Sequence, residues 1–330
     1  MEKDLFRTVV NIPKSAEIID VSHKVLFIGS CFATNMGSKM EEARFPAMVN
    51  PFGTMYNPMS IAWLLDSAIK LIDAGDLELA FNNGLWHSFF HHGMFSCPEP
   101  EDVVNEINRA TTETSNFLKE AEYIVITFGT SYVYEHKEKM SIVANCHKFP
   151  DNIFNRYLVE PEEIIETYTD LIVKLRVFNP HIKIIFTVSP VRHLKDGAHG
   201  NQISKSVLLL AIEKLIARFE KTLYFPSYEI VMDELRDYRF YNPEMIQPNE
   251  VAIEYIWKRF METYFSDDSK NFYLQMQKII KARNHRPSGF VTEEHIRFIN
   301  RNIDMIDSLK SQYPHAFLEN ERQFFLNLLP

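Results

Sequence analysis

Glycine and cysteine are scarce in this chain of 330 residues, which has 10 glycines and 3 cysteines. Three cysteines cannot form the paired framework of a small secreted domain, so the composition favours a reducing compartment. With so few glycines, each position is informative. Gly29, Gly53 and Gly129 each follow an apolar run or a proline-containing turn, where loops leave a sheet.

Long apolar runs and an excess of basic residues are also missing. No run reaches the roughly 18 apolar residues that a membrane span needs. The charged start, M-E-K-D-L-F, lacks the apolar core of a signal peptide. The formal net charge of −9 argues against an extended nucleic-acid surface. We therefore expect a cytoplasmic protein that acts on a small molecule, with neither nucleic acid nor membrane as a partner.

Hydrophobic residues make up 46% of the sequence, enough at this length for a large core. Short apolar segments without alternation are typical of strands buried on both faces of a parallel sheet. Such strands are expected at 25–28, 123–128, 182–188 and 223–226. Helical periodicity begins near residue 32 and recurs at 59–72, 103–122, 161–177, 204–219 and 250–264. This alternation predicts a parallel α/β sheet with helices on both faces.

After residue 266 the pattern changes to charged helices without strands, at 271–283 and 292–313, separated by R-P-S-G at 286–289. The sequence thus divides into an α/β domain, 1–266, and a helical C-terminal extension, 267–330. The extension is expected to pack against the main domain or a partner, and it is a candidate surface for a homodimer.

Ser30 and Cys31 lie where the first strand gives way to a helix. A helix N-terminus offers unpaired N–H groups and a partial positive charge, so it can hold an oxyanion and favours a thiolate over a thiol. The alternative is an inert, buried cysteine in a turn of small residues. Because ligands bind beyond the carboxyl ends of parallel strands, segments 29–31, 129–131 and 189–193 should meet at one crevice.

A stretch rich in aromatic residues and histidine, L-W-H-S-F-F-H-H-G-M-F at 85–95, has no clear period. We expect an aromatic lid with hydrogen-bonded histidines, in which Trp86 and His87 are candidate pocket residues. The stretch lacks a cysteine or carboxylate at ligand spacing, so we expect no metal there. The adjacent pair Cys146 and His147 is discounted as a dyad, because neighbours in a strand point to opposite faces.

Several runs resemble the signature of one family. G-S-C-F-A at 29–33 resembles the sequence that names the GSCFA family, a branch similar to the SGNH (GDSL-like) hydrolases. Further matching runs are N-P-F-G-T-M-Y-N-P at 50–58, G-L-W-H-S-F at 84–89, T-F-G-T-S-Y-V-Y at 127–134, N-C-H-K at 145–148, T-V-S-P-V-R-H-L-K-D-G-A-H-G-N-Q at 187–202 and D-E-L-R-D-Y-R-F-Y at 233–241. The resemblance implies a flavodoxin-like three-layer α/β/α sandwich with a site for ester chemistry.

The resemblance also implies roles for individual residues. Cys31 takes the nucleophile position of the superfamily's G-D-S turn, or Ser30 does if the turn is shifted by one residue. Gly53 matches the loop glycine of the oxyanion site, and Ser131 stands where that site has an asparagine. The remaining candidate pocket residues are Gly29, Asn50, Trp86, His87, Thr130, Arg192, His193 and His199.

The motif that should supply the general base departs from the family pattern. The expected run is D-M-[IV]-H-P, whereas this chain has Glu244 and Gln247 in E-M-I-Q-P. An amide has no titratable proton near neutral pH, so Gln247 cannot be a general base. Glu244 could still accept a proton, and His193 or His199 could substitute. A cysteine also needs less help than a serine, because some thiolate is present at neutral pH.

The leading hypothesis is an SGNH-like acyl-ester hydrolase or acyltransferase that uses no cofactor. Cys31 is its nucleophile, and Glu244 and Gln247 form a degenerate acid–base pair. Loss of a base typically removes several orders of magnitude in rate. The rival hypothesis is therefore a non-catalytic module that keeps the crevice and binds a small molecule or glycan.

Overall fold

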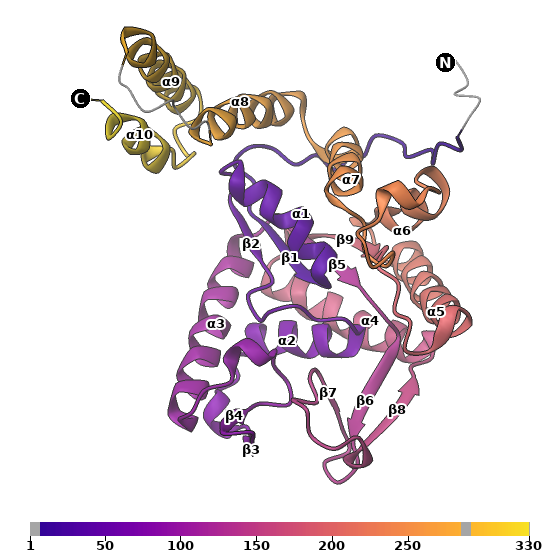
Figure 1. Ribbon diagram of the computed structural model, residues 1–330. Helices are drawn as coiled ribbons and strands as arrows, with labels where there is room; N and C mark the ends of the chain where they lie inside the picture. The colour runs from indigo at the N-terminus through magenta and orange to yellow at the C-terminus, as the bar shows by residue number, and fades with distance from the viewer. Residues whose placement is uncertain (1–6, 285–291, 330) are drawn as a thin grey trace.

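The computed structural model (Figure 1) describes residues 7–284 and 292–329. Its central sheet contains β1 (Val25–Gly29), β2 (Ala47–Val49), β5 (Tyr123–Phe128), β9 (Lys183–Val188) and β10 (Thr222–Tyr224). The strand order is β10-β9-β5-β1-β2, and every neighbouring pair is parallel. Counted among themselves, these strands follow the order 2-1-3-4-5, which is that of flavodoxin-like sheets. The predicted fold class is confirmed.

Side chains of the sheet alternate between two apolar cores. In β1, Leu26 and Ile28 join one core, and Val25 and Phe27 join the other. The first core is covered by α2 (Pro58–Lys70), α3 (Pro100–Glu120), α4 (Pro161–Phe178) and α5 (Gly197–Arg218). The second is covered by α1 (Cys31–Glu42) and α7 (Glu250–Tyr264) (Figure 1). Because each strand supplies both cores, its sequence is apolar throughout, and the layers are helix, sheet and helix.

Local sequence signals set where the helices begin. A proline is the first residue of α2, α3 and α4, where its missing N–H has no helical partner to lose. Asn57 caps α2 by accepting the Ser60 N–H at 2.8 Å. Helix α5 begins at Gly197, seven residues before the expected 204. The prediction began too late because the first turns of the helix carry no apolar periodicity in the sequence.

The sequence analysis did not predict several short elements. A three-stranded antiparallel sheet, in the order β7-β6-β8, follows β5, and β3 pairs with β4 in a hairpin. These strands are β3 (Ala80–Asn82), β4 (Leu85–His87), β6 (Tyr132–His136), β7 (Ser141–Val143) and β8 (Phe154–Leu158). The other short elements are η1 (Ala74–Asp76), η2 (Gly93–Phe95), η3 (Asp151–Ile153), α6 (Ser227–Glu229), the π-helix η4 (Ile230–Glu234) and η5 (Tyr238–Phe240).

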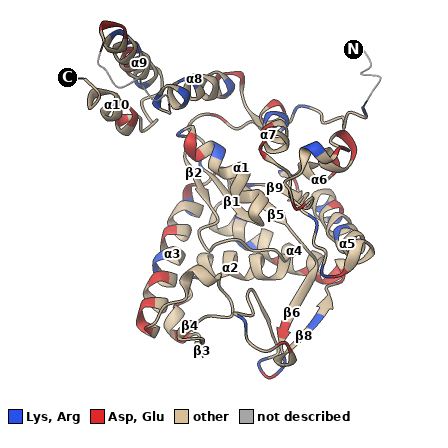
Figure 2. Ribbon diagram, viewed as in Figure 1, with Lys and Arg blue, Asp and Glu red and all other residues tan. Residues whose placement is uncertain are grey.

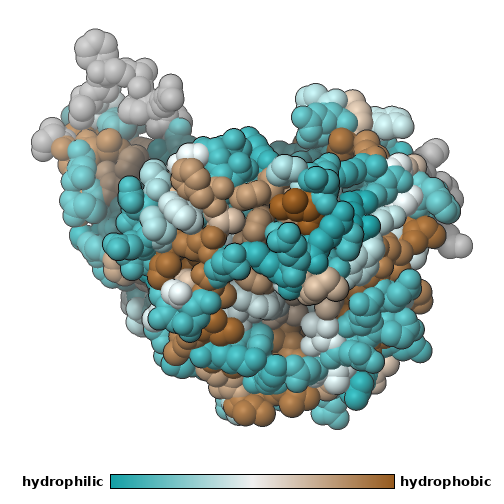
Figure 3. Space-filling model, turned by 90° about the horizontal axis from the view of Figure 1, so that it is seen from below, coloured by the Kyte–Doolittle hydropathy of each residue, from teal (hydrophilic) through white to brown (hydrophobic). Residues whose placement is uncertain are grey.

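The surface is mainly hydrophilic on the face that the space-filling view shows. Charged residues lie along the outer helices, whereas β1 and β5 contain none (Figure 2). Seen from the side of β3, β4 and the β6–β8 sheet, hydrophilic residues cover most of the face, and hydrophobic patches lie between them (Figure 3). Among the described helices, none combines the length and apolar character needed to cross a bilayer.

The C-terminal extension is continuous with the second core. It consists of α8 (Asp267–Arg283), α9 (Glu293–Gln312) and α10 (Glu319–Leu326), at the end of the molecule beyond α1 (Figure 1). The ring of Phe272 meets that of Phe45 edge-on, with centroids 5.1 Å apart. Arg44 forms an ion pair with the buried carboxylate of Glu321. The expected separator at 286–289 lies outside the described residues.

The turn that ends β1 requires glycine. Gly29 has φ +137°, and a Cβ there would overlap the carbonyl oxygen of Thr127 on β5. Its N–H donates to the Asn50 side chain at 2.8 Å, and its carbonyl accepts the Met55 N–H at 2.8 Å. Strands β1 and β5 can therefore approach closely at the point where the chain enters α1.

Replacing Gly29 should test this constraint. Gly29→Ala is expected to lower the free energy of unfolding by about 3 kcal/mol or more, since it adds a steric overlap to a strained backbone. Gly84→Ala is the matched control, because Gly84 also has a positive φ but open space around its Cβ. That control should lose only about 1 kcal/mol. Equal losses in urea denaturation of the two variants would contradict the proposed close approach.

Candidate active site

Ser30 and Cys31 have different environments in the turn between β1 and α1. Ser30 is the N-cap of α1 and is 1% exposed; its N–H donates to the Thr127 carbonyl at 3.2 Å. Its hydroxyl accepts the Phe32 N–H at 3.3 Å. Cys31 is the first helical residue and is half-buried. The Ser30 hydroxyl is thus engaged in capping, whereas the Cys31 thiol lies on the wall of a cavity.

That cavity has a volume of about 440 Å³ and lies at the carboxyl ends of the parallel strands. It is bounded by the segments that follow β1, β2, β5 and β9, by the small antiparallel sheet and by residues 244–247. This is where the strand order reverses between β1 and β5, the usual ligand position in such sheets. A second cavity of about 520 Å³, between α2, α4 and the antiparallel sheet, includes none of the predicted site residues.

The structure brings the three predicted strand ends together. The predicted residues on the cavity wall are Ser30, Cys31, Thr130, Arg192, His193, Glu244 and Gln247. They come from positions up to 217 residues apart in the sequence, counted from Ser30 to Gln247. The convergence therefore follows from the parallel sheet and not from local sequence.

The two predicted oxyanion residues lie off this wall. The Gly53 N–H already donates to the Asn50 carbonyl at 2.8 Å, and the position of a Cβ on Gly53 is filled by His92. Ser131 is 0% exposed, and its N–H and hydroxyl both bond to Ser204 on α5, at 2.8 and 3.2 Å between N or Oγ and the Ser204 Oγ. Both residues fix loops around the site.

Other predicted pocket residues are also placed elsewhere. Asn50 braces the Gly29 turn and donates to Thr34 at 2.8 Å. His87 lies on β4, where its nitrogens bond to Ser96 Oγ at 2.7 Å and to the Asn82 carbonyl at 3.0 Å. Trp86, its neighbour on β4, packs against the first core. His199 is exposed on α5 and does not line the cavity.

The histidine-bearing stretches contain no arrangement for a metal in the described residues, where no three His, Cys, Asp or Glu side chains are grouped to hold an ion. Cys146 and His147 lie in a turn and not in a strand, so the reason given for discounting them as a dyad was wrong. The His147 Nε2 bonds to the Ser88 carbonyl at 2.8 Å, and burial raises the pKa of Cys146 to about 11.

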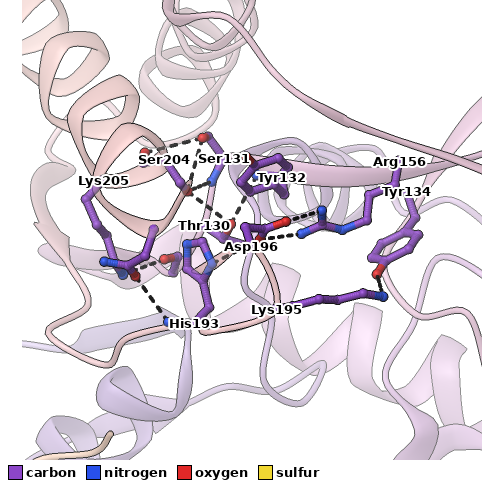
Figure 4. Close-up of polar contacts among 12 residues, drawn as sticks. Thr130, Ser131, Tyr132, Tyr134, Arg156, His193, Lys195, Asp196, Ser204 and Lys205 are labelled. Atoms are coloured by element: carbon purple, nitrogen blue, oxygen red, sulfur yellow. Dashed lines mark hydrogen bonds and ion pairs between the residues drawn. The ribbon is translucent and has the colours of Figure 1, made fainter. Parts of the chain in front are cut away.

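His193 has the geometry of an oriented base. Its Nδ1 lies 3.3 Å from the Oδ2 of Asp196. The two terminal nitrogens of Arg156 bind the two oxygens of the same carboxylate (Figure 4). The Nε2 of His193 is buried and has no hydrogen-bond partner among the described residues. Burial and the charge of Lys205 hold the pKa of His193 below its ordinary value of 6.5, although Asp196 opposes them. The imidazole is therefore neutral at neutral pH; a proton placed on Nδ1, facing Asp196, leaves Nε2 free to accept one.

Lys205 is one of the site residues that the sequence analysis missed. It is fully buried on α5, and its Nζ donates to the carbonyls of Gly129 and Ser189 at 2.6 and 2.8 Å (Figure 4). Burial lowers the pKa of this amine to about 7, and the nearby Cys31 opposes the shift. Lys205 lies three residues before Leu208, on the apolar face of the helix, and that spacing could have revealed it.

The helix N-terminus does not by itself make Cys31 a thiolate. Burial raises the thiol pKa above its ordinary value of 9.0, although the N–H groups of Cys31 and Phe32 and the charge of Lys205 act in the other direction. The expected stabilisation of the anion is thus present but outweighed. A reaction at this sulfur needs a base to take the proton.

Glu244 and Gln247 lie at the exposed rim of the cavity. Their turn is closed by the Asn242 N–H, which donates to the Gln247 carbonyl at 2.8 Å, and Met245 adopts φ +59°. Within the described residues, neither side chain has a hydrogen-bond partner. A carboxylate held so loosely is poorly oriented to act as a base.

The comparisons with known proteins identify the family. The chain matches the GSCFA family over residues 24–260, more than half of its length, and belongs to that family. Residues 276–330 match the C-terminal domain of GSCFA domain proteins. The comparison with curated proteins gave no match.

Two solved structures show distant likeness. One is a carbohydrate esterase family 3 protein from Talaromyces cellulolyticus, 10% identical, with 78% of this chain and 98% of that chain covered and a TM-score of 0.32. The other is an acetyl xylan esterase from Butyrivibrio proteoclasticus, 14% identical, with 77% and 64% covered and a TM-score of 0.30. Scores this low add nothing to the fold and site described above.

The buried amine of Lys205 predicts a pH-dependent stability. Its pKa is about 7 in the folded chain and ordinarily 10.5, so between these values the unfolded chain binds more protons. Folding stability should therefore rise with pH across this window, and Lys205→Met should abolish that part of the rise. Urea denaturation of wild type and variant at pH 6, 8 and 10 measures the difference. A difference that does not change with pH would show that the amine titrates normally.

Proposed function

We propose that the 440 Å³ cavity is the active site of an acyl-ester hydrolase or acyltransferase with Cys31 as nucleophile and His193 as general base. The observation that carries the proposal is that His193, oriented by Asp196 and with Nε2 unpartnered, lines the same cavity as Cys31. A carboxylate, a histidine and a nucleophile in one crevice form the arrangement used for acyl transfer on unrelated folds. No hydrogen bond joins the thiol to His193 in this structure, so the proposal requires this contact to form when substrate binds, as catalytic hydrogen bonds often tighten only in the complex.

The reaction would proceed in two halves. The Nε2 of His193 takes the thiol proton, and the sulfur of Cys31 attacks the ester carbonyl carbon to give a tetrahedral oxyanion. Collapse expels the alcohol, which takes the proton from His193, and leaves a thioester on Cys31. Water, or an acceptor alcohol, then gives its proton to His193 and attacks the thioester carbonyl. The C–S bond breaks, the carboxylic acid or the new ester leaves, and the proton on His193 returns to the sulfur to restore the thiol.

Two groups on the wall can stabilise the oxyanion. The Cys31 N–H lies at the N-terminus of α1. The Asn57 amide donates one hydrogen to Ser60 at 3.0 Å and has a second one available. When protonated, Lys205 adds a positive charge that acts on the Cys31 sulfur. In this proposal Asn57 replaces the predicted donors Gly53 and Ser131.

The three cysteines are unpaired, which supports action in a reducing compartment such as the cytoplasm. A non-catalytic binding module remains the rival function, because the motif histidine is replaced by Gln247. The two functions differ in one respect: only the enzyme requires the Cys31 sulfur for turnover.

Removal of the sulfur or of the base should separate the two. With 4-nitrophenyl acetate as substrate, Cys31→Ala should abolish turnover and His193→Ala should lower kcat by at least about a hundredfold. Cys97→Ala and His199→Ala are matched controls, since neither residue lines the cavity. Turnover that survives in Cys31→Ala would disprove the assignment of the nucleophile, and its absence from wild type would favour the binding module.

The pH profile should identify the base. The pKa of His193 lies below 6.5, and only neutral imidazole accepts a proton, so kcat/KM should fall as pH drops through a value under 6.5. Asp196→Asn removes the carboxylate that raises this pKa, so the acid limb should move to lower pH while kcat falls. An acid limb that stays in place in Asp196→Asn would rule out His193 as the titrating group.

Restoring the family histidine gives an independent check. If His193 already serves as the base, Gln247→His should change kcat by less than about threefold, since the rim turn does not orient its side chain. A gain of tenfold or more, toward the roughly hundredfold or larger factor typical of general-base catalysis, would instead show that the base position is empty in the native chain.

A further inference from the structure

We infer that the ester bound in this cavity carries an anionic group, a carboxylate or a phosphate, which is received by the guanidinium of Arg192. This inference rests on the proposed function for the reaction, although the binding of the anion can be measured without it. It specifies the substrate class that the chain selects among acyl esters.

Arg192 is a half-buried cation that forms no ion pair with a carboxylate among the described residues. In the described part of the chain, no Asp or Glu oxygen lies within ion-pair distance of it. Its Nη2 donates instead to the Sδ of Met232 at 3.0 Å, and the guanidinium also lies beside the Tyr241 hydroxyl. A thioether is a weak acceptor, so most of the five donors of the guanidinium remain available. Arginine presents these donors in a planar fork that matches a carboxylate or phosphate.

The other guanidinium on the wall shows the contrast. Arg156 is bound by Asp196 through both of its terminal nitrogens and lies over the Tyr132 ring, 4.2 Å from its centroid. Its charge is neutralised within the protein. Arg192, on the same cavity, has no such partner in the part of the chain that the structure describes, and it is therefore the group that a ligand can neutralise.

The balance of charge in the cavity favours an anion. Its lining carries three cations, Arg156, Arg192 and Lys195, against two carboxylates, Asp196 and Glu244. The buried Lys205 lies close enough to interact electrostatically with Arg192 and adds to the positive potential when protonated. The chain as a whole has a net charge of −9, so this concentration of cations is local. A positive cavity in an acidic protein attracts and retains anionic ligands.

The backbone fixes Arg192 between the reacting groups and the rim. It precedes His193 directly, and its N–H is 3.5 Å from the Ile246 carbonyl in the turn that carries Glu244 and Gln247. Met232, which contacts the guanidinium, lies in the π-helix η4, a rare conformation that is frequent at functional sites. The anion would thus lie next to His193 and the rim turn.

Binding to the Cys31→Ala variant tests the inference without any chemistry. Calorimetric titrations should use monomethyl succinate, inorganic phosphate and the neutral ester methyl butyrate. We expect one of the two anions to bind at least about tenfold more tightly than methyl butyrate, and Arg192→Gln in the same background to remove that preference. Tighter binding of monomethyl succinate assigns a carboxylate, and tighter binding of phosphate assigns a phosphate. Equal binding of all three probes would overturn the inference.

Controls distinguish a specific guanidinium from a general effect of charge. Arg236→Gln removes an exposed arginine that is paired with Asp233 and lies outside the cavity, and it should keep the preference for the anion. Arg192→Lys should retain part of it. If Arg236→Gln loses the preference as fully as Arg192→Gln does, Arg192 is not the receptor.

A kinetic comparison then connects the anion to the reaction. In wild type, kcat/KM for mono-4-nitrophenyl succinate should exceed that for 4-nitrophenyl butyrate, and Arg192→Gln should lower this ratio at least about tenfold. An unchanged ratio would overturn the inference while leaving the esterase standing. Anion binding by Cys31→Ala, with no turnover of either ester by wild type, would refute the proposed enzyme and retain the anion site.

Discussion

The close approach of β1 and β5 is the constraint on which the site depends. Gly29 has no side chain, so the backbone of β1 can reach the Thr127 carbonyl, and the chain can turn into α1 with Ser30 as its cap. That turn places Cys31 at the reversal of strand order, beside the segments that follow β5 and β9. A bulkier residue would separate the two strands and displace the thiol from the groups that converge on it.

The buried amine of Lys205 also stabilises this edge of the sheet. Lys205 donates to carbonyls that follow two neighbouring strands, and so it satisfies acceptors that would otherwise be buried without partners. Its charge also acts on both Cys31 and His193. One side chain therefore links the packing of the sheet edge to the protonation of the two groups that the proposed reaction uses.

Much of the fold could be predicted because buried parallel strands leave a strong sequence signal. The strand 123–128 and the helix 250–264 were predicted with the bounds that the structure shows. The β6–β8 sheet was not predicted, because short strands with polar, half-exposed residues such as Glu135 and Arg156 lack that signal. For the same reason Asp196, which Arg156 holds beside His193, could not be recognised as an orienting group.

The site was predictable where topology determined it and unpredictable where tertiary contacts did. The convergence of Cys31, Arg192 and His193 follows from the parallel sheet alone. The use of the Gly53 N–H by Asn50, and of the Ser131 hydroxyl by Ser204, depends on loop packing that no local pattern encodes. The pKa of Cys31 likewise depends on how deeply the helix end is buried, which the sequence does not state.

The shared core has a consequence for how the molecule unfolds. The sequence pattern changes at residue 267, but Phe272 packs on Phe45, and the carboxylate of Glu321 is buried against Arg44. Helices α8 to α10 therefore contribute to the same apolar cluster as α1 and α7. The change in composition at residue 267 therefore does not separate two cooperative folding units. The α/β sandwich and its helical extension should unfold in a single transition.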